Sequence, residues 1–113
     1  MKGNRRQKNC VVVLVTCPTR AQAVRIATAI VKQRVAACVN IVPGLTSIFR
    51  WQGKLERTRE VLLVIRTTAR RFSALARLVR SLHPYDVPEI ISLPITAGHS
   101  PYLRWVRDSV SST

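Results

Sequence analysis

The side chains best suited to chemistry in this sequence are thiols and imidazoles. The thiols belong to Cys10, Cys17 and Cys38, and the imidazoles to His83 and His99. Thiolate and imidazole ligands suit Cu(I), Cu(II) and Zn(II). No Cys-x-x-Cys, His-x-x-x-His or similar local chelate occurs, so a metal site has to be assembled across the fold or across copies of the chain. Harder ligands for such a site are Glu56, Glu60, Asp86 and Glu89.

The cysteines also have an interpretation as small buried hydrophobic residues. An odd number of thiols in a chain expected to lie in the cytoplasm argues for free cysteines and against a disulfide framework. Cys38 follows Ala36 and Ala37 at the entry to a predicted hairpin, where the buried interpretation is favoured over a ligand role.

A second group of candidates combines aromatic rings with polar side chains. Concave apolar surfaces with a few polar groups are typical of ligand pockets, whereas Trp, Tyr and Arg also anchor protein interfaces. The two interpretations carry equal weight and are compatible, because a cleft between subunits can hold both anchors and a ligand. The members are Trp51, Tyr85, Tyr102, Trp105, Glu60, Arg66, His83 and Glu89.

Catalytic motifs are missing from the sequence. It contains no nucleophile elbow and no paired-carboxylate spacing, and its four glycines are too few for a phosphate-gripping loop. A loop histidine beside a proline, as at His83-Pro84, is more often structural or a ligand than an acid–base catalyst. We therefore expect a protein that is not an enzyme and has no organic cofactor.

The elements that position these residues centre on a long β-hairpin, residues 39–68. Gly53 supports a tight turn at its tip, and Pro43-Gly44 predicts a bulge or bend in the ascending arm. The descending arm is rich in β-branched residues, as in a buried strand. A ribbon of this length projects beyond its own sheet. Isolated ribbons are marginally stable in water, so the projection should pair, most simply with another copy of the chain.

Three helices and two short strands surround the hairpin. Residues 10–17 form an apolar run of strand length, and a capping box at Thr19 to Gln22 starts a helix that ends near Arg34. Thr68 is predicted to cap a second helix over residues 69–82. A strand over residues 90–95 follows, and Ser100-Pro101 opens a last helix that ends near Val110.

This order, β-α-β-β-α-β with an extra C-terminal helix, predicts an α+β, ferredoxin-like fold. We expect a flexible basic tail over residues 1–9 and a single domain over residues 10–113, because the chain is long enough for one core. One sheet face remains bare in this fold, and the terminal helix and neighbouring subunits are the available cover.

The net charge of +14 comes from 19 basic and 5 acidic residues. It raises the possibility of a nucleic-acid partner. However, the basic residues are spread along the sequence and no stacking-aromatic motif is present, so a solvated surface is favoured over nucleic-acid binding. No apolar run is long enough to cross a bilayer, and no membrane partner is expected. The basic start is interpreted as a tail and not a signal peptide, which predicts a cytoplasmic location.

Several spaced motifs follow one another along the chain. They are Ala36-Ala37-Cys38-Val39-Asn40, Phe49-Arg50-Trp51-Gln52-Gly53-Lys54, Ile65-Arg66-Thr67-Thr68, His83-Pro84-Tyr85-Asp86-Val87-Pro88-Glu89-Ile90 and Tyr102-Leu103-Arg104-Trp105. Together, and in this order, they resemble the CutA divalent-cation tolerance proteins over residues 11–110.

The resemblance implies a PII-like fold and a homotrimer in which the long hairpins pair between subunits. It also implies an association with copper tolerance and divalent-cation binding without evident catalysis. Cys38, His83 and Cys17 are the candidate metal ligands, and Arg66 stands where the family often has lysine. The alternative is a PII-like signalling or scaffold trimer that binds a small anionic ligand through Arg66 in clefts between subunits.

Overall fold

A computed structural model describes residues 9–111 of the chain, so most of the predicted tail, residues 1–8, lies outside the described part. The elements are β1 (Cys10–Cys17), α2 (Arg20–Lys32), β2 (Cys38–Trp51), β3 (Lys54–Thr68), a 3₁₀ turn η1 (Ala69–Arg71), α3 (Phe72–Leu82), β4 (Ile90–Pro94) and α4 (Ser100–Ser109). None of the helices in residues 9–111 is both long and apolar enough to span a bilayer.

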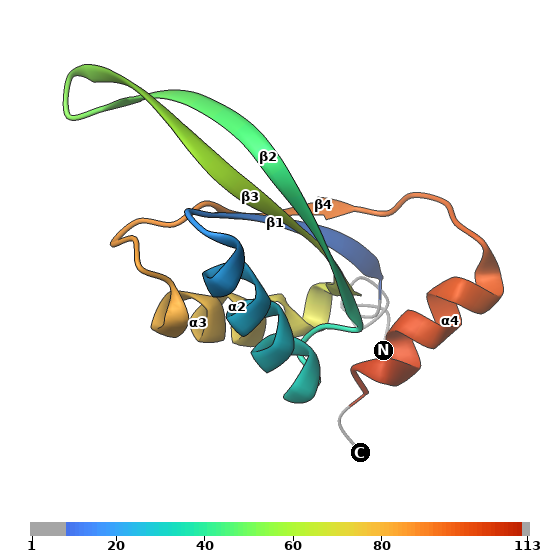
Figure 1. The fold of residues 1–113 in the computed structure, drawn as a ribbon. Helices are drawn as coiled ribbons and strands as arrows, with labels where there is room; N and C mark the ends of the chain where they lie inside the picture. The colour runs from blue at the N-terminus through green and yellow to red at the C-terminus, as the bar shows by residue number, and fades with distance from the viewer. Residues whose placement is uncertain (1–8, 112–113) are drawn as a thin grey trace.

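The four strands form one antiparallel sheet in the order β2-β3-β1-β4. α2 and α3 lie side by side against one face of this sheet, and α4 lies at the end where β1 begins (Figure 1). The predicted α+β element order is confirmed. We call the face covered by α2 and α3 the helix-covered face and the opposite one the helix-free face.

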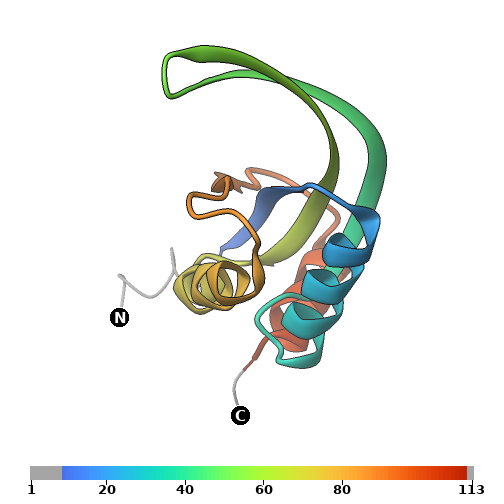
Figure 2. The same ribbon diagram turned by 60° about the vertical axis from the view of Figure 1, so that its left-hand side comes forward.

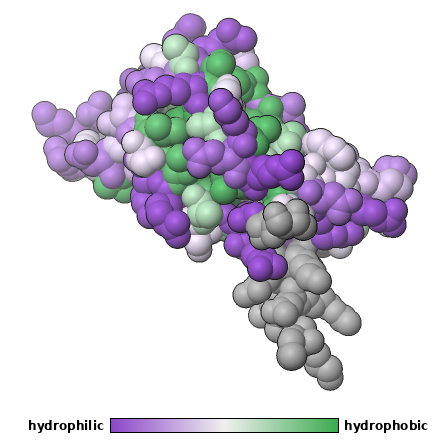
Figure 3. All heavy atoms as spheres, turned by 90° about the horizontal axis from the view of Figure 1, so that it is seen from below, coloured by the Kyte–Doolittle hydropathy of each residue, from purple (hydrophilic) through white to green (hydrophobic). Residues whose placement is uncertain are grey.

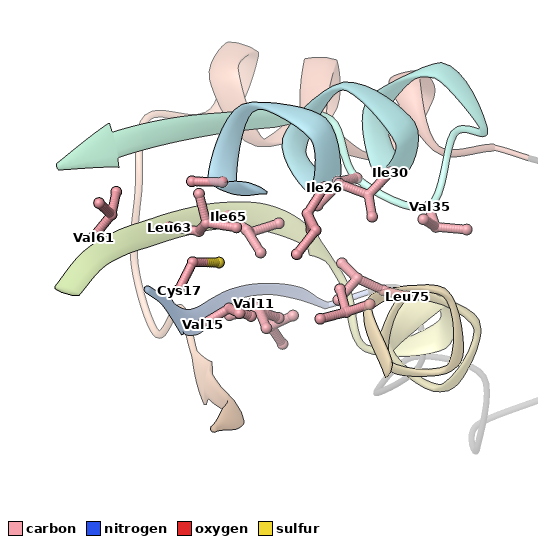
Figure 4. Close-up of a cluster of buried hydrophobic side chains, with 14 residues drawn as sticks. Val11, Val15, Cys17, Ile26, Ile30, Val35, Val61, Leu63, Ile65 and Leu75 are labelled. Carbon is pink, nitrogen blue, oxygen red and sulfur yellow. The ribbon is translucent and has the colours of Figure 1, made fainter. Parts of the chain in front are cut away.

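The core lies between the sheet and the two helices (Figure 4). Strand side chains alternate between faces, so every second residue of β1 and β3 points toward the helices. Ile26 and Ile30 of α2 and Leu75 of α3 meet them from the other side. The strand residues in this core are Val11, Val13, Val15, Cys17, Val61, Leu63 and Ile65.

The helix boundaries confirm one predicted cap and correct the others. The Thr19 hydroxyl accepts a hydrogen bond from the Gln22 N–H at 3.2 Å, which is the first half of the predicted capping box. The Gln22 side-chain oxygen accepts from the Thr19 hydroxyl at 3.0 Å, and not from the Thr19 backbone N–H as a full capping box requires. α2 stops at Lys32, because Arg34 adopts a left-handed φ of 60° that a helix cannot continue through. Thr68 makes no side-chain cap bond, and the chain passes through η1 before α3. His99, rather than Ser100, occupies the N-cap position of α4.

The hairpin is the longest feature of the molecule, which measures 47 × 25 × 25 Å. The register of β2 on β3 shifts between Val42 and Leu45, which confirms the irregularity predicted at Pro43-Gly44. At the tip, Gln52 and Gly53 have φ values of 50° and 80°, a pair typical of a type I′ turn. We call residues 43–59 the distal ribbon. Apart from Leu45, which lies opposite Glu60, its paired residues pair with one another, and the ribbon curves away from the rest of the sheet (Figure 2).

The helix-free face is apolar and largely uncovered in a single chain. Rows of cross-strand neighbours run over it, such as Val12 beside Leu93 and Leu14 beside both Val64 and Ile91. α4 covers only the end near Cys10, where it contributes the buried Val106 and Val110. Other apolar side chains on the face, Val42, Ile91 and Leu93, remain exposed.

Candidate functional site

The predicted site residues gather mainly in two clusters at opposite ends of β1. The thiol–tyrosine cluster, Cys38, Arg66, Tyr102 and Trp105, lies where β1 begins, because Cys38 and Val12 are both register partners of Arg66. The Glu60–Tyr85 cluster, Glu60, His83 and Tyr85, lies where β1 ends, beside Thr16. β-sheet alternation places the strand members of the first cluster on one face, since Cys38 and Arg66 are directly opposite each other.

Tyr102 connects the strands of the thiol–tyrosine cluster to α4. Its hydroxyl accepts a hydrogen bond from Arg66 Nε at 3.2 Å and lies 3.4 Å from Cys38 Sγ. The Tyr102 hydrogen is therefore free to point at the sulfur. The Tyr102 and Trp105 rings are 5.6 Å apart, so one turn of α4 presents an aromatic pair beside the thiol.

The Arg66 guanidinium is held by acceptors of its own chain. Besides Tyr102, it donates to the Val64 carbonyl at 3.1 Å and to the Asn40 side-chain oxygen at 2.6 Å. The hydrogen bond between Tyr102 and the Cys38 thiol, followed by burial, raises the pKa of the Tyr102 hydroxyl, which therefore remains neutral at physiological pH. The cluster carries the positive charge of Arg66 and one half-buried thiol.

The Glu60–Tyr85 cluster contains a buried carboxylate. Glu60 is 7% exposed, and its Oε2 accepts a hydrogen bond from the Tyr85 hydroxyl at 2.8 Å. Burial, together with this bond to Glu60, raises the pKa of Tyr85 to about 12. The loop of residues 83–89, stiffened by two prolines, brings Tyr85 from beyond α3 to β3.

His83 has both ring nitrogens engaged within the chain. Nε2 donates to the Thr16 carbonyl at 2.7 Å, and Nδ1 accepts from the Tyr85 N–H at 3.1 Å. The side chain is also buried. In this conformation His83 joins the loop to the end of β1, and a metal ion would have to displace one of these bonds.

The three predicted metal ligands do not converge within one chain. Cys38 lies level with Val12 in the sheet, because both are opposite Arg66. Val12 is five residues from Cys17 along β1, which corresponds to about 17 Å. Cys17 is fully buried, and burial followed by the charge of Glu60 raises its pKa to about 11. In residues 9–111, no group of three His, Cys, Asp or Glu side chains is close enough to hold a metal ion. Of the three predicted ligands, Cys38 is the one that is partly exposed.

Two further candidates lie apart from both clusters. Trp51 is 48% exposed at the tip of the distal ribbon, and Glu89 is exposed just before β4. Asn40 is a site residue that sequence reasoning missed. Its signal is the alternation of β2, which puts Cys38 and Asn40 on the same face with one residue between them.

Comparisons with known proteins agree with this architecture. Residues 11–109 match the family model described as CutA1 divalent ion tolerance protein. The chain is 53% identical over 98 residues to the divalent-cation tolerance protein CutA of Thermus thermophilus, covering 87% of this chain and 95% of that one. It is 50% identical over 98 residues to protein CutA of Homo sapiens, again covering 87% of this chain but 55% of the human one.

Solved structures show the same fold. The divalent cation tolerance protein Cut A1 of Thermus thermophilus superposes with a TM-score of 0.89 at 51% identity, covering 90% of this chain and 99% of that chain. CutA1 of Oryza sativa superposes equally well at 42% identity, covering 93% and 96%. With a family match over almost all of the described residues, the chain belongs to the CutA1 divalent ion tolerance protein family.

Proposed function

We propose that this protein is a homotrimeric divalent-cation tolerance protein that binds copper without catalysing a reaction. The observation that carries the proposal is the distal ribbon beside an uncovered helix-free face. Both surfaces require a partner that a single chain does not supply. The family membership contributes the role in cation tolerance.

The distal ribbon exposes much of its apolar surface. Leu55 is 73% exposed and Ile48 is 64% exposed, and Phe49 and Trp51 are also exposed. β2 is an edge strand of the sheet, so its outer backbone groups are unpaired. Pairing of this edge with a second copy, and packing of the copies over the helix-free face, would cover both surfaces. Three copies close a ring with equivalent contacts.

Light scattering coupled to size-exclusion chromatography tests the assembly. We expect a mass of three times the chain mass of 12.7 kDa, independent of concentration in the micromolar range. A monomer at these concentrations contradicts the proposal, because it would leave the apolar face and the ribbon in water.

Copper binding is proposed to depend on Cys38. Cys38 combines partial exposure with a soft thiol, and the Tyr102 hydroxyl, 3.4 Å from its sulfur, offers an additional oxygen. Because the ligands of one chain do not converge, the remaining ligands would come from a neighbouring subunit or from solvent. Cys17 is a poor candidate, because burial opposes formation of its thiolate.

Calorimetric titration with Cu(II) and Zn(II) separates these roles. We expect Cys38→Ser to weaken copper binding at least about tenfold, about 1.4 kcal/mol, because a hydroxyl is a much poorer ligand for a soft ion. Cys17→Ala is the matched control and should leave binding unchanged. Equal binding by the wild-type chain and Cys38→Ser would exclude Cys38 as the anchor.

The alternative of a small anionic ligand at Arg66 has less support. Three of the five donors of the guanidinium already have acceptors in the same chain. An anion would have only the two remaining donors of a guanidinium that Asn40 and Tyr102 already hold in place.

A further inference from the structure

The outer surface of the helix layer carries positive charge only. We define the helix layer as α2 with its extension to Arg34 together with η1 and α3, residues 20–34 and 69–82. Eight basic residues and no acidic residue lie in these segments. All of them except the half-buried Arg71 are exposed. They are Arg20, Arg25, Lys32, Arg34, Arg70, Arg71, Arg77 and Arg80.

The five acidic residues of the chain lie elsewhere in the fold. Glu56 and Glu60 are on β3, Asp86 and Glu89 are in the loop before β4, and Asp108 is on α4. Ordinary soluble surfaces intersperse both signs of charge. The fold therefore concentrates positive charge on the helix layer and places four of the five acidic side chains on other elements away from α2 and α3, while Asp108 lies near Arg34.

Groups of the same chain offset little of this charge. Asp108 of α4 lines one surface pocket together with Arg34, at the edge of the layer. Within residues 9–111, Arg71 is the one basic side chain of the layer with a hydrogen-bond acceptor, the Val110 carbonyl at 2.7 Å. Arg77 and Arg80 are three residues apart on α3, a spacing at which like charges repel each other. Arg25 has no acidic residue three or four positions away on α2. Most basic side chains of the helix layer are therefore available to bind an external anion.

The dimensions of the helix layer suit a polymer that carries regularly spaced anionic groups. α2 is about 18 Å long, because a helix rises about 1.5 Å per residue, and α3 packs beside it on the same face (Figure 2). From the helix side, hydrophilic side chains border a central apolar area (Figure 3). Seven of the eight basic residues are arginine, whose planar fork matches the oxygens of a phosphate.

We propose that the helix layer binds the sugar–phosphate backbone of a nucleic-acid duplex. No aromatic side chain of α2 or α3 is exposed for base stacking, which disfavours a single strand. Val24 and Val31 are the exposed large apolar residues of the two helices, too few for insertion into a membrane surface. Contacts between arginine and backbone phosphates require neither exposed aromatic rings nor an apolar surface.

This inference does not depend on the trimer or on copper. Each chain presents its own helix layer, on the face opposite to the one that further copies would cover. The sequence spreads the basic residues over two segments about fifty positions apart, and packing of both helices on one face brings them together.

The experiment is fluorescence anisotropy with the full chain and labelled duplexes of DNA and of RNA, each two helical turns long. We expect binding to at least one duplex, with an affinity that falls about 10³-fold between about 50 and 200 mM salt. The triple variant Arg20→Glu, Arg25→Glu, Arg77→Glu should weaken binding at least tenfold more than its matched control. It places acidic residues where helices tolerate them, in the first turn or the middle.

The matched control is Lys2→Glu, Arg5→Glu, Arg6→Glu, which makes the same change in net charge outside the described residues. Circular dichroism and light scattering confirm that both variants are folded and assembled like the wild type. An equal loss in both triple variants would assign the binding to net charge and overturn the proposal. So would no binding at low salt, or tighter binding to phosphatidylserine vesicles than to either duplex.

Discussion

The thiol of Cys17 and the hydroxyl of Tyr85 are both held in their neutral forms by the fold. The pKa of Cys17 rises to about 11 from an ordinary value of 9.0, mainly through burial, and that of Tyr85 rises to about 12 from 10.0. A raised folded-state pKa for an acid means that its neutral form is stabilised by folding. These two residues therefore make the protein sensitive to high pH.

The first prediction concerns alkaline stability. The contribution from Cys17 should be fully present below pH 9 and lost as the pH rises from 9 to 11, and that from Tyr85 should be lost between pH 10 and 12. Denaturant midpoints measured at fixed protein concentration across this range should fall. The fall between pH 9 and 11 should be shallower in Cys17→Ala, and identical slopes in the two proteins would contradict the assignment.

At the scale of elements, a single buried hydroxyl ties the hairpin to the segment after α2. Thr67 Oγ1 on β3 donates to the Val35 carbonyl at 2.7 Å, and Thr67 is fully buried. This bond satisfies a buried carbonyl in the connection between α2 and β2 that sheet pairing does not reach. The neighbouring Thr68 is also buried but makes no side-chain cap bond.

The second prediction compares the effect on stability of replacing Thr67 with that of replacing Thr68. Thr67→Val keeps the shape of the side chain but leaves the Val35 carbonyl unsatisfied, so unfolding free energy should fall by about 1–3 kcal/mol. Thr68→Val is the matched control and should change stability by less than about 1 kcal/mol. Urea denaturation of both variants measures the difference. Equal values would show that the Thr67 bond contributes no more than ordinary packing.

At the scale of the whole molecule, the distal ribbon contributes nothing to the core of its own chain. All buried residues of the two apolar clusters come from outside residues 43–59. The apolar core of one chain therefore does not depend on the ribbon. This agrees with the proposal that the ribbon serves contacts with other copies.

A shortened hairpin tests this division of roles. Removing residues 48–57 and joining Ser47 to Thr58 through Asn-Gly preserves the register. These two residues are opposite each other, and their pair lies four steps below the Trp51–Lys54 pair that closes the native turn, so it has the same hydrogen-bonded pattern. We expect a folded chain by circular dichroism that does not form the proposed trimer in light scattering. A shortened chain that still assembles would show that the helix-free face suffices, and an unfolded one would show that the ribbon supports its own domain.

Much of this architecture could be read from local sequence signals. The tight turn at Gln52-Gly53, the bulge at Pro43-Gly44 and the Thr19 cap each depend on a few adjacent residues, so their chemistry is visible without a structure. The caps at Thr68 and Ser100 were predicted wrongly. A suitable residue type allows a cap bond, but the local backbone decides whether the side chain reaches the free N–H groups.

The sequence by itself determined the order of elements, the hairpin and the family, because periodicity, turn residues and motifs are local properties of the chain. Only the tertiary structure decided which distant residues meet. It separated Cys17 from Cys38, placed Tyr102 against Arg66, buried Glu60 under Tyr85 and joined the basic residues of two helices in one layer. The reason is that register and packing set these distances, and neither is encoded in the spacing of the residues along the chain.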